Sequence, residues 1–446
     1  MADELRQSAE KVLQLACDKN GVQAEVYLLD AEDKRIEVSG LSVENMKIAQ
    51  ERGLGLRIIK DGCLGYAYTS DWGEPALKLV VEQALHNAQQ TQPDEYWELP
   101  EQTNAYQPMA LFDEATFAVP IEDKIKLAQE MEEAAKSADK RIRLVEKAVY
   151  QEAFYRTFIM NSKGLSGEYR GSYCGIYTVA LGSENQDNQT GMAMQFARKY
   201  SELEAPRIGR EAAAKAVRML GAQSIASAVL PVVLDPYIGT NFLGVLQTPF
   251  SGEAVLKGKS FYRGKGGKSV AGPLVTIIDD GSMPKRLGSA PFDGEGVPSQ
   301  ETVLIEQGRL TGLLHNLYTA QKSGVSSTGN SVRGSYKSTP EVGITNFYMA
   351  PGEKSPQEII GELPKGLYVT DVMGMHTANP VSGDFSLGAA GLLIENGELT
   401  RPVKGVAIAG NLQEILMDVD AVGNDLTFFV TKGAPTLRIK AMSVSG

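Results

Sequence analysis

The chain of 446 residues is poor in cysteine. Cys17, Cys63 and Cys174 are odd in number, far apart in the sequence and outside any CxxC motif. This pattern excludes the disulfide framework of a small secreted domain. It predicts free thiols in a reducing compartment.

Long apolar runs are missing as well. The sequence has no stretch of about 18 apolar residues, the length that a membrane-spanning helix needs. Its first residues, MADELRQSAEKVL, are charged and amphipathic and do not resemble a signal peptide. We therefore expect a cytoplasmic protein that has no membrane partner.

Basic charge is also in short supply. The chain has 44 Lys and Arg residues against 55 Asp and Glu residues, a formal net charge of −11. Nucleic acid is not an expected partner, because neutralising phosphates requires clustered basic side chains. The one local basic run, between Lys257 and Lys268, is interpreted as a solvated loop.

Histidine is scarce, and this limits the chemistry that the sequence can support. His86, His315 and His376 lie in separate segments, and no HExxH motif occurs. A zinc site built from them would require distant segments to converge. The chain also lacks a G-x-S-x-G elbow, and GKGGKS at 264–269 has Tyr262 where a P-loop would begin with glycine.

Hydrophobic periodicity divides the chain into two halves. The first half alternates helical patterns with strand patterns, and Asp61–Gly62 marks a hairpin turn. A polar loop is expected at 183–191. The predicted helices are 5–16, 74–92, 121–138 and 208–222, and the predicted strands are 24–30, 34–40 and several within 142–200.

The second half is rich in short strands and glycine turns, and few long helical patterns remain. Hairpin turns are expected at Gln307–Gly308 and Asn396–Gly397. The predicted strands are 229–235, 274–281, 302–316, 366–374, 391–403 and 426–430.

These patterns predict an α+β fold with three parts. Residues 1–205 would form an N-terminal α/β domain, an antiparallel sheet with helices. Residues 206–226 would form a linking helix. Residues 227–446 would form a mostly antiparallel β domain that is barrel-like.

One short segment, SGEAVLKGKS at 251–260, has the layout of a zinc-peptidase helix without its histidines. Glu253 stands at its centre, with Gly252 before it and Lys257 four residues after it. Glycine has no side chain to offer a metal, and a protonated lysine cannot coordinate one. The interpretation that requires no catalytic role is that Glu253 and Lys257 form a surface ion pair on one helix face.

Three long segments resemble the TldD/PmbA family, and in particular its PmbA branch, also called TldE. They are ERGLGLRIIKDGCLGYAYTSD at 51–71, IGREAAAKAVRMLGA at 208–222, and the block from MGMHTANPVSGDFS to GNLQEIL at 373–416. The family has been described both as modulators of DNA gyrase and as metalloproteases. Its catalytic branch has an H-E-x-x-x-H helix and a cysteine ligand near the C-terminus.

The resemblance implies that this chain has lost the metal site. Gly252 and Lys257 occupy the two histidine positions, Glu253 matches the general base, and no cysteine follows Cys174. No cofactor is expected in this chain, and zinc is expected in a TldD-type partner. The chain would be the non-catalytic subunit of a heterodimer that processes unfolded or short peptides, with a homodimer as the form adopted alone.

Two alternatives stay open from the sequence. The chain is a self-sufficient metallopeptidase with an unrecognised site, for instance around His315, His376 and Asp384, or it is a peptide-binding adaptor that modulates gyrase. Asn379, Asp384 and Asn411 are candidate peptide contacts. Turn formation explains the same residues, because Asn and Asp side chains cap their own backbone.

Overall fold

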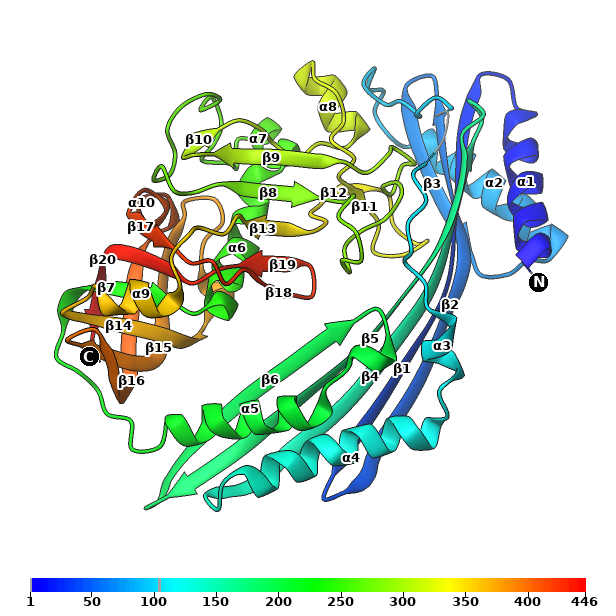
Figure 1. Ribbon diagram of the computed structural model, residues 1–446. Coiled ribbons are helices and arrows are strands. Elements are labelled where there is room, and N and C mark those ends of the chain that lie inside the picture. The colour runs from blue at the N-terminus through cyan, green and yellow to red at the C-terminus, as the bar shows by residue number, and fades with distance from the viewer. Residues whose placement is uncertain (1, 103–105) are drawn as a thin grey trace.

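A long antiparallel sheet forms the N-terminal half of the molecule. The computed structural model describes residues 2–102 and 106–446. The sheet has six strands in the order β3-β2-β1-β4-β5-β6 and curves as a half-barrel around the C-terminal half (Figure 1). The strands are β1 (Val22–Ser39), β2 (Ser42–Lys60), β3 (Cys63–Thr69), β4 (Ile142–Asn161), β5 (Ser166–Glu184) and β6 (Asp187–Ala197).

Helices cover the outer face of this sheet and confirm the predicted helical segments. Helices α1 (Ala2–Cys17) and α2 (Glu74–Ala88) pack at one end, and α4 (Ile121–Ala138) and α5 (Ala205–Arg218) at the other. Gly209 lets α5 approach α4, because a Cβ there would lie 2.2 Å from the Met131 carbonyl oxygen. The short helices α3 (Glu114–Ala118) and η1 (Tyr200–Glu202) complete this half.

Two predictions for this half are wrong. The segments 24–30 and 34–40 belong to one strand, β1, because the polar residues between them pair with β2 and β4 without interruption. Residues 183–191 are not a loop. They form the ends of β5 and β6 around a tight turn at Asn185 and Gln186, whose φ angles are 50° and 66°.

The C-terminal half contains a closed barrel. Strands β16, β15, β14, β7 and β20 pair in succession, and β16 also pairs with β20, which closes the ring. The predicted barrel-like antiparallel domain is therefore confirmed, although β7 and β14 pair in parallel. The strands are β7 (Ala228–Leu234), β14 (Lys365–Met373), β15 (Asp384–Glu395), β16 (Glu398–Asn411) and β20 (Leu437–Ser445), with β17 (Val419–Val422) alongside β20.

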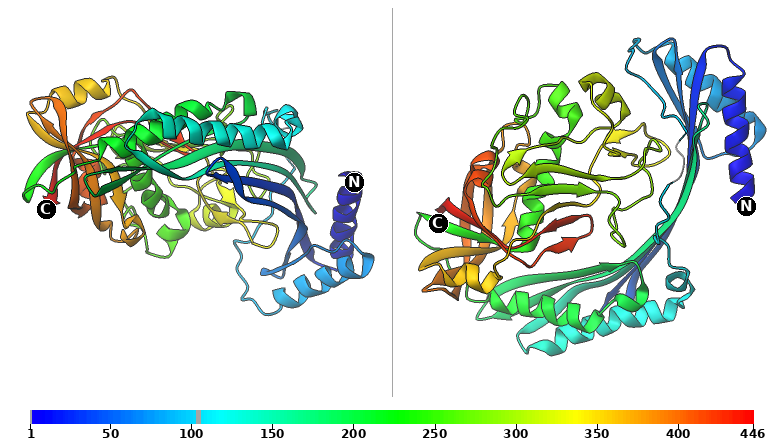
Figure 2. Two further views of the ribbon diagram at one scale, coloured as in Figure 1. Left: turned by 90° about the horizontal axis from the view of Figure 1, so that it is seen from below. Right: turned by 45° about the horizontal axis from the view of Figure 1, so that its top comes forward.

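A second six-stranded sheet lies beside the barrel, in the order β10-β9-β8-β13-β19-β18. Its strands are β8 (Ile277–Asp280), β9 (Glu301–Glu306), β10 (Arg309–Leu310), β13 (Phe347–Met349), β18 (Thr427–Phe429) and β19 (Lys432–Ala434). A separate pair is formed by β11 (Ser331–Val332) and β12 (Glu341–Val342). The right-hand view in Figure 2 shows the C-terminal half seated against the concave side of the long sheet.

The C-terminal half contains one long helix that the sequence patterns did not predict. Helix α6 (Pro236–Phe250) is central to the C-terminal core, and its apolar, glycine-containing sequence lacks the one-sided pattern that reveals a surface helix. The hairpin predicted at Gln307–Gly308 within 302–316 is confirmed by the pairing of β9 with β10, but strand structure ends at Leu310, and Asn316 caps a new helix, α8 (Leu317–Ser323). The remaining helices are α7 (Gly252–Leu256), α9 (Pro356–Gly361), η2 (Met375–Thr377) and α10 (Leu412–Met417).

In the part of the chain that the structure describes, no helix is both long and apolar enough to cross a membrane. The three cysteines are all free.

Candidate functional site

The segment that resembles a metal helix forms α7, a helix of five residues that directly follows α6. Its Glu253 Oε1 accepts a hydrogen bond from Lys257 Nζ at 2.5 Å. The two side chains are 42% and 60% exposed, so water screens this ion pair. Glu253 raises the pKa of Lys257, which keeps the ammonium protonated.

Gly252 is buried against His315, a contact that sequence spacing did not reveal. The Gly252 N–H donates to the Leu314 carbonyl at 2.8 Å. A Cβ at position 252 would lie 2.3 Å from His315 Nδ1, a distance that real Cβ atoms do not show. The imidazole of His315 therefore fills the space that any larger side chain at position 252 would need.

His315 is held in place by its own neighbours. Its Nδ1 lies 3.2 Å from Thr319 Oγ1, and its backbone N–H donates to Thr328 Oγ1 at 2.8 Å. The residue is 6% exposed, and burial lowers the pKa of its imidazole. A neutral ring packed in this way fills the space beside Gly252.

A cavity of about 630 Å³ opens in front of α7. Its polar wall includes the Glu253–Lys257 pair, and its apolar wall comes from the β11–β12 segment and from a turn that precedes β15. The lining residues are Gln247, Thr248, Ser251, Glu253, Ala254, Lys257, Lys259, Leu314, Val332, Val342, Gly343, Ile344 and Val381. The volume is large enough for several side chains of a peptide.

The turn before β15 brings together the three candidate peptide contacts. Asn379 Oδ1 accepts from the backbone N–H of Val381 at 2.8 Å. Asn411 Nδ2 donates to Asp384 Oδ1 at 2.8 Å, and this bond lowers the pKa of Asp384. Asn411 also caps α10 through Oδ1. Each side chain thus has a partner within the turn, and their role as peptide contacts stays a prediction.

The alternative site around His315, His376 and Asp384 gains no support. His315 is buried behind α7, whereas His376 in η2 and Asp384 in β15 are both exposed. Within residues 2–102 and 106–446, no group of three or more His, Cys, Asp or Glu side chains is arranged to hold a metal ion.

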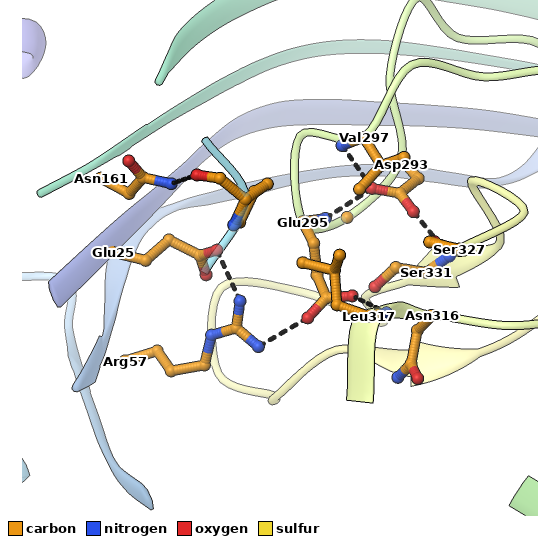
Figure 3. Close-up of polar contacts among 12 residues, drawn as sticks. Glu25, Arg57, Asn161, Asp293, Glu295, Val297, Asn316, Leu317, Ser327 and Ser331 are labelled. Atoms are coloured by element: carbon orange, nitrogen blue, oxygen red, sulfur yellow. Dashed lines mark hydrogen bonds and ion pairs between the residues drawn. The ribbon is translucent and has the colours of Figure 1, made fainter. Parts of the chain in front are cut away.

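A buried charge network links the long sheet to the helix that follows His315, and sequence reasoning missed it (Figure 3). Arg57 on β2 donates to Glu25 on β1 and to Glu295, both at 2.7 Å. Glu295 Oε2 also accepts from the Leu317 N–H at the start of α8, at 3.0 Å. Partners more than 200 residues apart leave no periodic signal in a sequence.

Comparison with known proteins identifies the family to which this chain belongs. Three models of PmbA/TldA metallopeptidases match it in succession, domain 1 at 24–88, the central domain at 115–220 and the C-terminal domain at 227–446. The chain belongs to the PmbA/TldD metalloprotease family.

Relatives within this family match along nearly the whole length. A metalloprotease PmbA homolog of Haemophilus influenzae is 29% identical, and the match covers 99% of this chain and 96% of that one. A solved structure from Thermotoga maritima, of a protein proposed to modulate a DNA gyrase, is 29% identical with a TM-score of 0.92, covering 99% and 100%. TldE from Thermococcus kodakarensis shares the fold at 24% identity and a TM-score of 0.91, covering 98% and 100%.

The metal that the PmbA/TldD family implies does not fit the residues around α7. Gly252 offers neither a donor atom nor room for one, and Lys257 is protonated. Cys174 is the last cysteine in the sequence, and it is buried on β5 of the long sheet. Glu253 alone cannot hold a zinc ion, because structural and catalytic sites use three or four ligands.

Proposed function

We propose that this chain is the non-catalytic subunit of a TldD/TldE-type heterodimeric metalloprotease that processes unfolded or short peptides in the cytoplasm. The observation that supports this is the environment of Gly252, where His315 stands in the space that a metal-ligating side chain would require. A helix whose ligand position is closed by its own fold has no means of activating water. The zinc ion and the hydrolytic step then belong to a TldD-type partner.

In this proposal the chain contributes a peptide-binding surface and no catalytic group. The cavity before α7 accepts part of an extended peptide. Val381, which lines it, belongs to the turn that contains Asn379 and leads into Asp384, and Asn411 at the end of β16 is hydrogen-bonded to Asp384. A peptide binds there by adding itself as a strand to an exposed sheet edge, which gives affinity through main-chain hydrogen bonds and little sequence preference. Folded proteins are excluded because their main chain is already paired.

The test combines the chain with a TldD-type chain from the same cell. Zinc content is measured by elemental analysis for each chain alone and for the mixture, and cleavage of a labelled unfolded peptide is followed in all three samples. We expect zinc in the partner only, and cleavage that requires both chains. Stoichiometric zinc in this chain alone, or cleavage by it alone, would refute the proposal in favour of a self-sufficient enzyme.

A matched pair of variants distinguishes a peptide-binding role from a catalytic role. Glu253→Gln in the reconstituted heterodimer should keep cleavage within a few-fold of wild type, whereas loss of a general base costs about 10²-fold or more. Asn379→Ala should reduce cleavage while leaving the melting temperature and partner binding nearly unchanged. If the mixture binds gyrase but cleaves no peptide, the adaptor function replaces the one proposed.

A further inference from the structure

The contact between the long sheet and the C-terminal half contains a balanced set of buried charges. Arg57 lies between Glu25 and Glu295, and Arg333 forms an ion pair with Glu25 from the other side. All four side chains are at most 2% exposed. Figure 3 shows Arg57 between Glu25 and Glu295. With Arg333 included, two guanidinium groups and two carboxylates cancel one another, so this set by itself needs no further ion.

Asp293 adds a negative charge that this set does not balance. Its Oδ1 accepts from the N–H groups of Glu295 and Val297 at 2.9 and 3.0 Å, and its Oδ2 accepts from the Ser331 N–H at 3.0 Å. The residue is 8% exposed, and no cation within the described residues forms an ion pair with it. Three backbone donors favour the ionised form, yet burial and the nearby Glu295 raise the pKa of Asp293 to about 7.

A second buried carboxylate adds to the imbalance. Asp279 on β8 is 1% exposed and accepts from Thr345 and from Asn330 Nδ2, neither of which bears a charge. It too has no ion-pair partner among residues 2–102 and 106–446. Burial raises the pKa of Asp279 to about 6. Asp293 and Asp279 are thus two buried carboxylates that lack an ion-pair partner in the described part of the chain.

A cavity of about 180 Å³ adjoins Asp293 at the same contact. The sheet contributes hydroxyl-bearing and aromatic side chains to it, and the C-terminal half contributes Asp293 and Ser331. The lining residues are Tyr27, Thr157, Tyr169, Gly288, Ala290, Phe292, Asp293, Gly294, Ser299, Ser331, Val332, Arg333, Ile344 and Thr345.

Ser331 supplies an independent sign that something polar binds in this cavity. The residue is 3% exposed, and its Oγ has no hydrogen-bond partner among the residues that the structure describes. A buried hydroxyl without a partner costs about 1–3 kcal/mol. A ligand in the cavity that contacts Ser331 Oγ would remove this cost.

We propose that this cavity binds a small monovalent cation beside Asp293, either an alkali-metal ion or a primary ammonium group. Carboxylate and hydroxyl oxygens are the ligands that such ions prefer, and aromatic rings such as those of Tyr169 and Phe292 in the cavity wall attract an ammonium group. An anion is disfavoured by Asp293. A divalent metal is disfavoured because no cluster of three acidic, histidine or cysteine side chains exists in the described part of the chain.

The bound cation acts on the docking of the two halves. The cavity has walls from both the long sheet and the C-terminal half, so an ion inside it neutralises Asp293 only when they are in contact. Binding therefore stabilises the assembled form by mass action. This role is independent of peptide processing.

The test measures the melting temperature of the purified chain at constant ionic strength. Choline chloride, whose cation is too bulky and lacks an N–H donor, is replaced stepwise by potassium, sodium or methylammonium chloride. We expect a saturable rise of at least about 2 °C with one or more of the small cations. Response to the metal ions alone identifies an alkali-metal site, and response to methylammonium alone identifies an ammonium site.

Variants assign the effect to this cavity. Asp293→Asn should abolish the rise and Ser331→Ala should weaken it, while Asp18→Asn, at an exposed position, should leave it unchanged. Because Asp293→Asn could fail to fold, crystals of the wild-type chain soaked in rubidium or thallium salts provide a second measurement through anomalous scattering. Equal melting temperatures in all four salts, an undiminished rise in Asp293→Asn, or water alone beside Asp293 would overturn the proposal.

Discussion

Two ion-pair regions of this molecule use the same side-chain types and differ in burial. On α7, Lys257 and Glu253 face water with about half of each side chain exposed. At the contact between the halves, Arg57, Glu25 and Glu295 are almost completely enclosed. An exposed pair is worth about 0–1 kcal/mol, whereas breaking a buried one costs about 3–5 kcal/mol. The ion pair on α7 is therefore expendable for stability, and the ion pairs at the contact between the halves are not.

The largest expected effect on stability comes from removing Arg57, the side chain that pairs with both Glu25 and Glu295. Arg57→Ala leaves Glu295 as an uncompensated buried charge, while Glu25 keeps Arg333, and should lower the free energy of unfolding by about 3–5 kcal/mol. Urea denaturation followed by circular dichroism measures this change. The double variant Arg57→Met/Glu295→Met removes both signs of charge and should be less destabilised than Arg57→Ala. Equal stability of Arg57→Ala and wild type would show that water enters the contact.

The second effect is the pH dependence of stability, which has opposite signs for Asp279 and Asp384. The pKa of Asp279 is about 6 in the folded chain, above its ordinary value of 3.8, so the folded state holds a proton that the unfolded state releases. The stability that this proton contributes is present below about pH 4 and is lost as the pH rises through 6, a change of about 2–3 kcal/mol. The advantage of wild type over Asp279→Asn in urea denaturation should shrink over this range.

Asp384 provides the matched control for this pH effect. Asn411 holds the pKa of Asp384 below its usual range, so any stability from this exposed group is present above its ordinary pKa and lost in acid. The difference between wild type and Asp384→Asn should therefore grow, not shrink, as the pH rises from 3 to 5. The same direction of change for both variants would contradict the assignment of Asp279 as the buried, raised group.

A third prediction concerns the attempt to rebuild a metal helix. Gly252→His/Lys257→His should bind no stoichiometric zinc, because His315 occupies the space beside position 252. Overpacking should lower the free energy of unfolding by about 1–3 kcal/mol. Adding His315→Ala should recover part of that loss, while Lys257→His alone should have almost no effect. Tight zinc binding by the double variant, measured by elemental analysis, would contradict this view of the site.

The smallest effect is expected on the exposed pair itself. Lys257→Ala should change the free energy of unfolding by less than about 0.5 kcal/mol, because water and salt screen the pair that it forms with Glu253. Its control is Lys124→Ala, which removes a buried cation from Glu152 and should be far more destabilising. A large effect of Lys257→Ala on folding would show that α7 supports the core.

Sequence patterns predicted the elements whose burial is one-sided. Helix α5 has such a pattern, and the hairpin at Asn396–Gly397 has the turn residues that its positive φ angles require. Helix α6 was not predicted, because apolar residues occur around most of its circumference and its faces therefore differ little in polarity. The strand β1 was split in two because its middle residues are polar although fully paired.

The candidate site was predictable only in part. Gly252, Glu253 and Lys257 lie within six residues, so their pattern can be seen in the sequence. The contact of Gly252 with His315 and that of Arg57 with Glu295 join segments separated by 63 and 238 residues, and only the fold brings them together. Asn379, Asp384 and Asn411 were grouped by their place in one block, and the hydrogen bond between Asn411 and Asp384 became visible only in the fold.

The pairing of β7 within the barrel has a consequence for how the protein is synthesised. Strand β7 emerges early in the C-terminal half, yet both of its neighbours, β14 and β20, are translated much later. Until residues 437–445 have left the ribosome, β7 has an unpaired edge and the ring cannot close. During that interval the nascent chain exposes the apolar strand AVLPVVL, residues 228–234, to pairing with other chains, which makes this stage a point of dependence on chaperones.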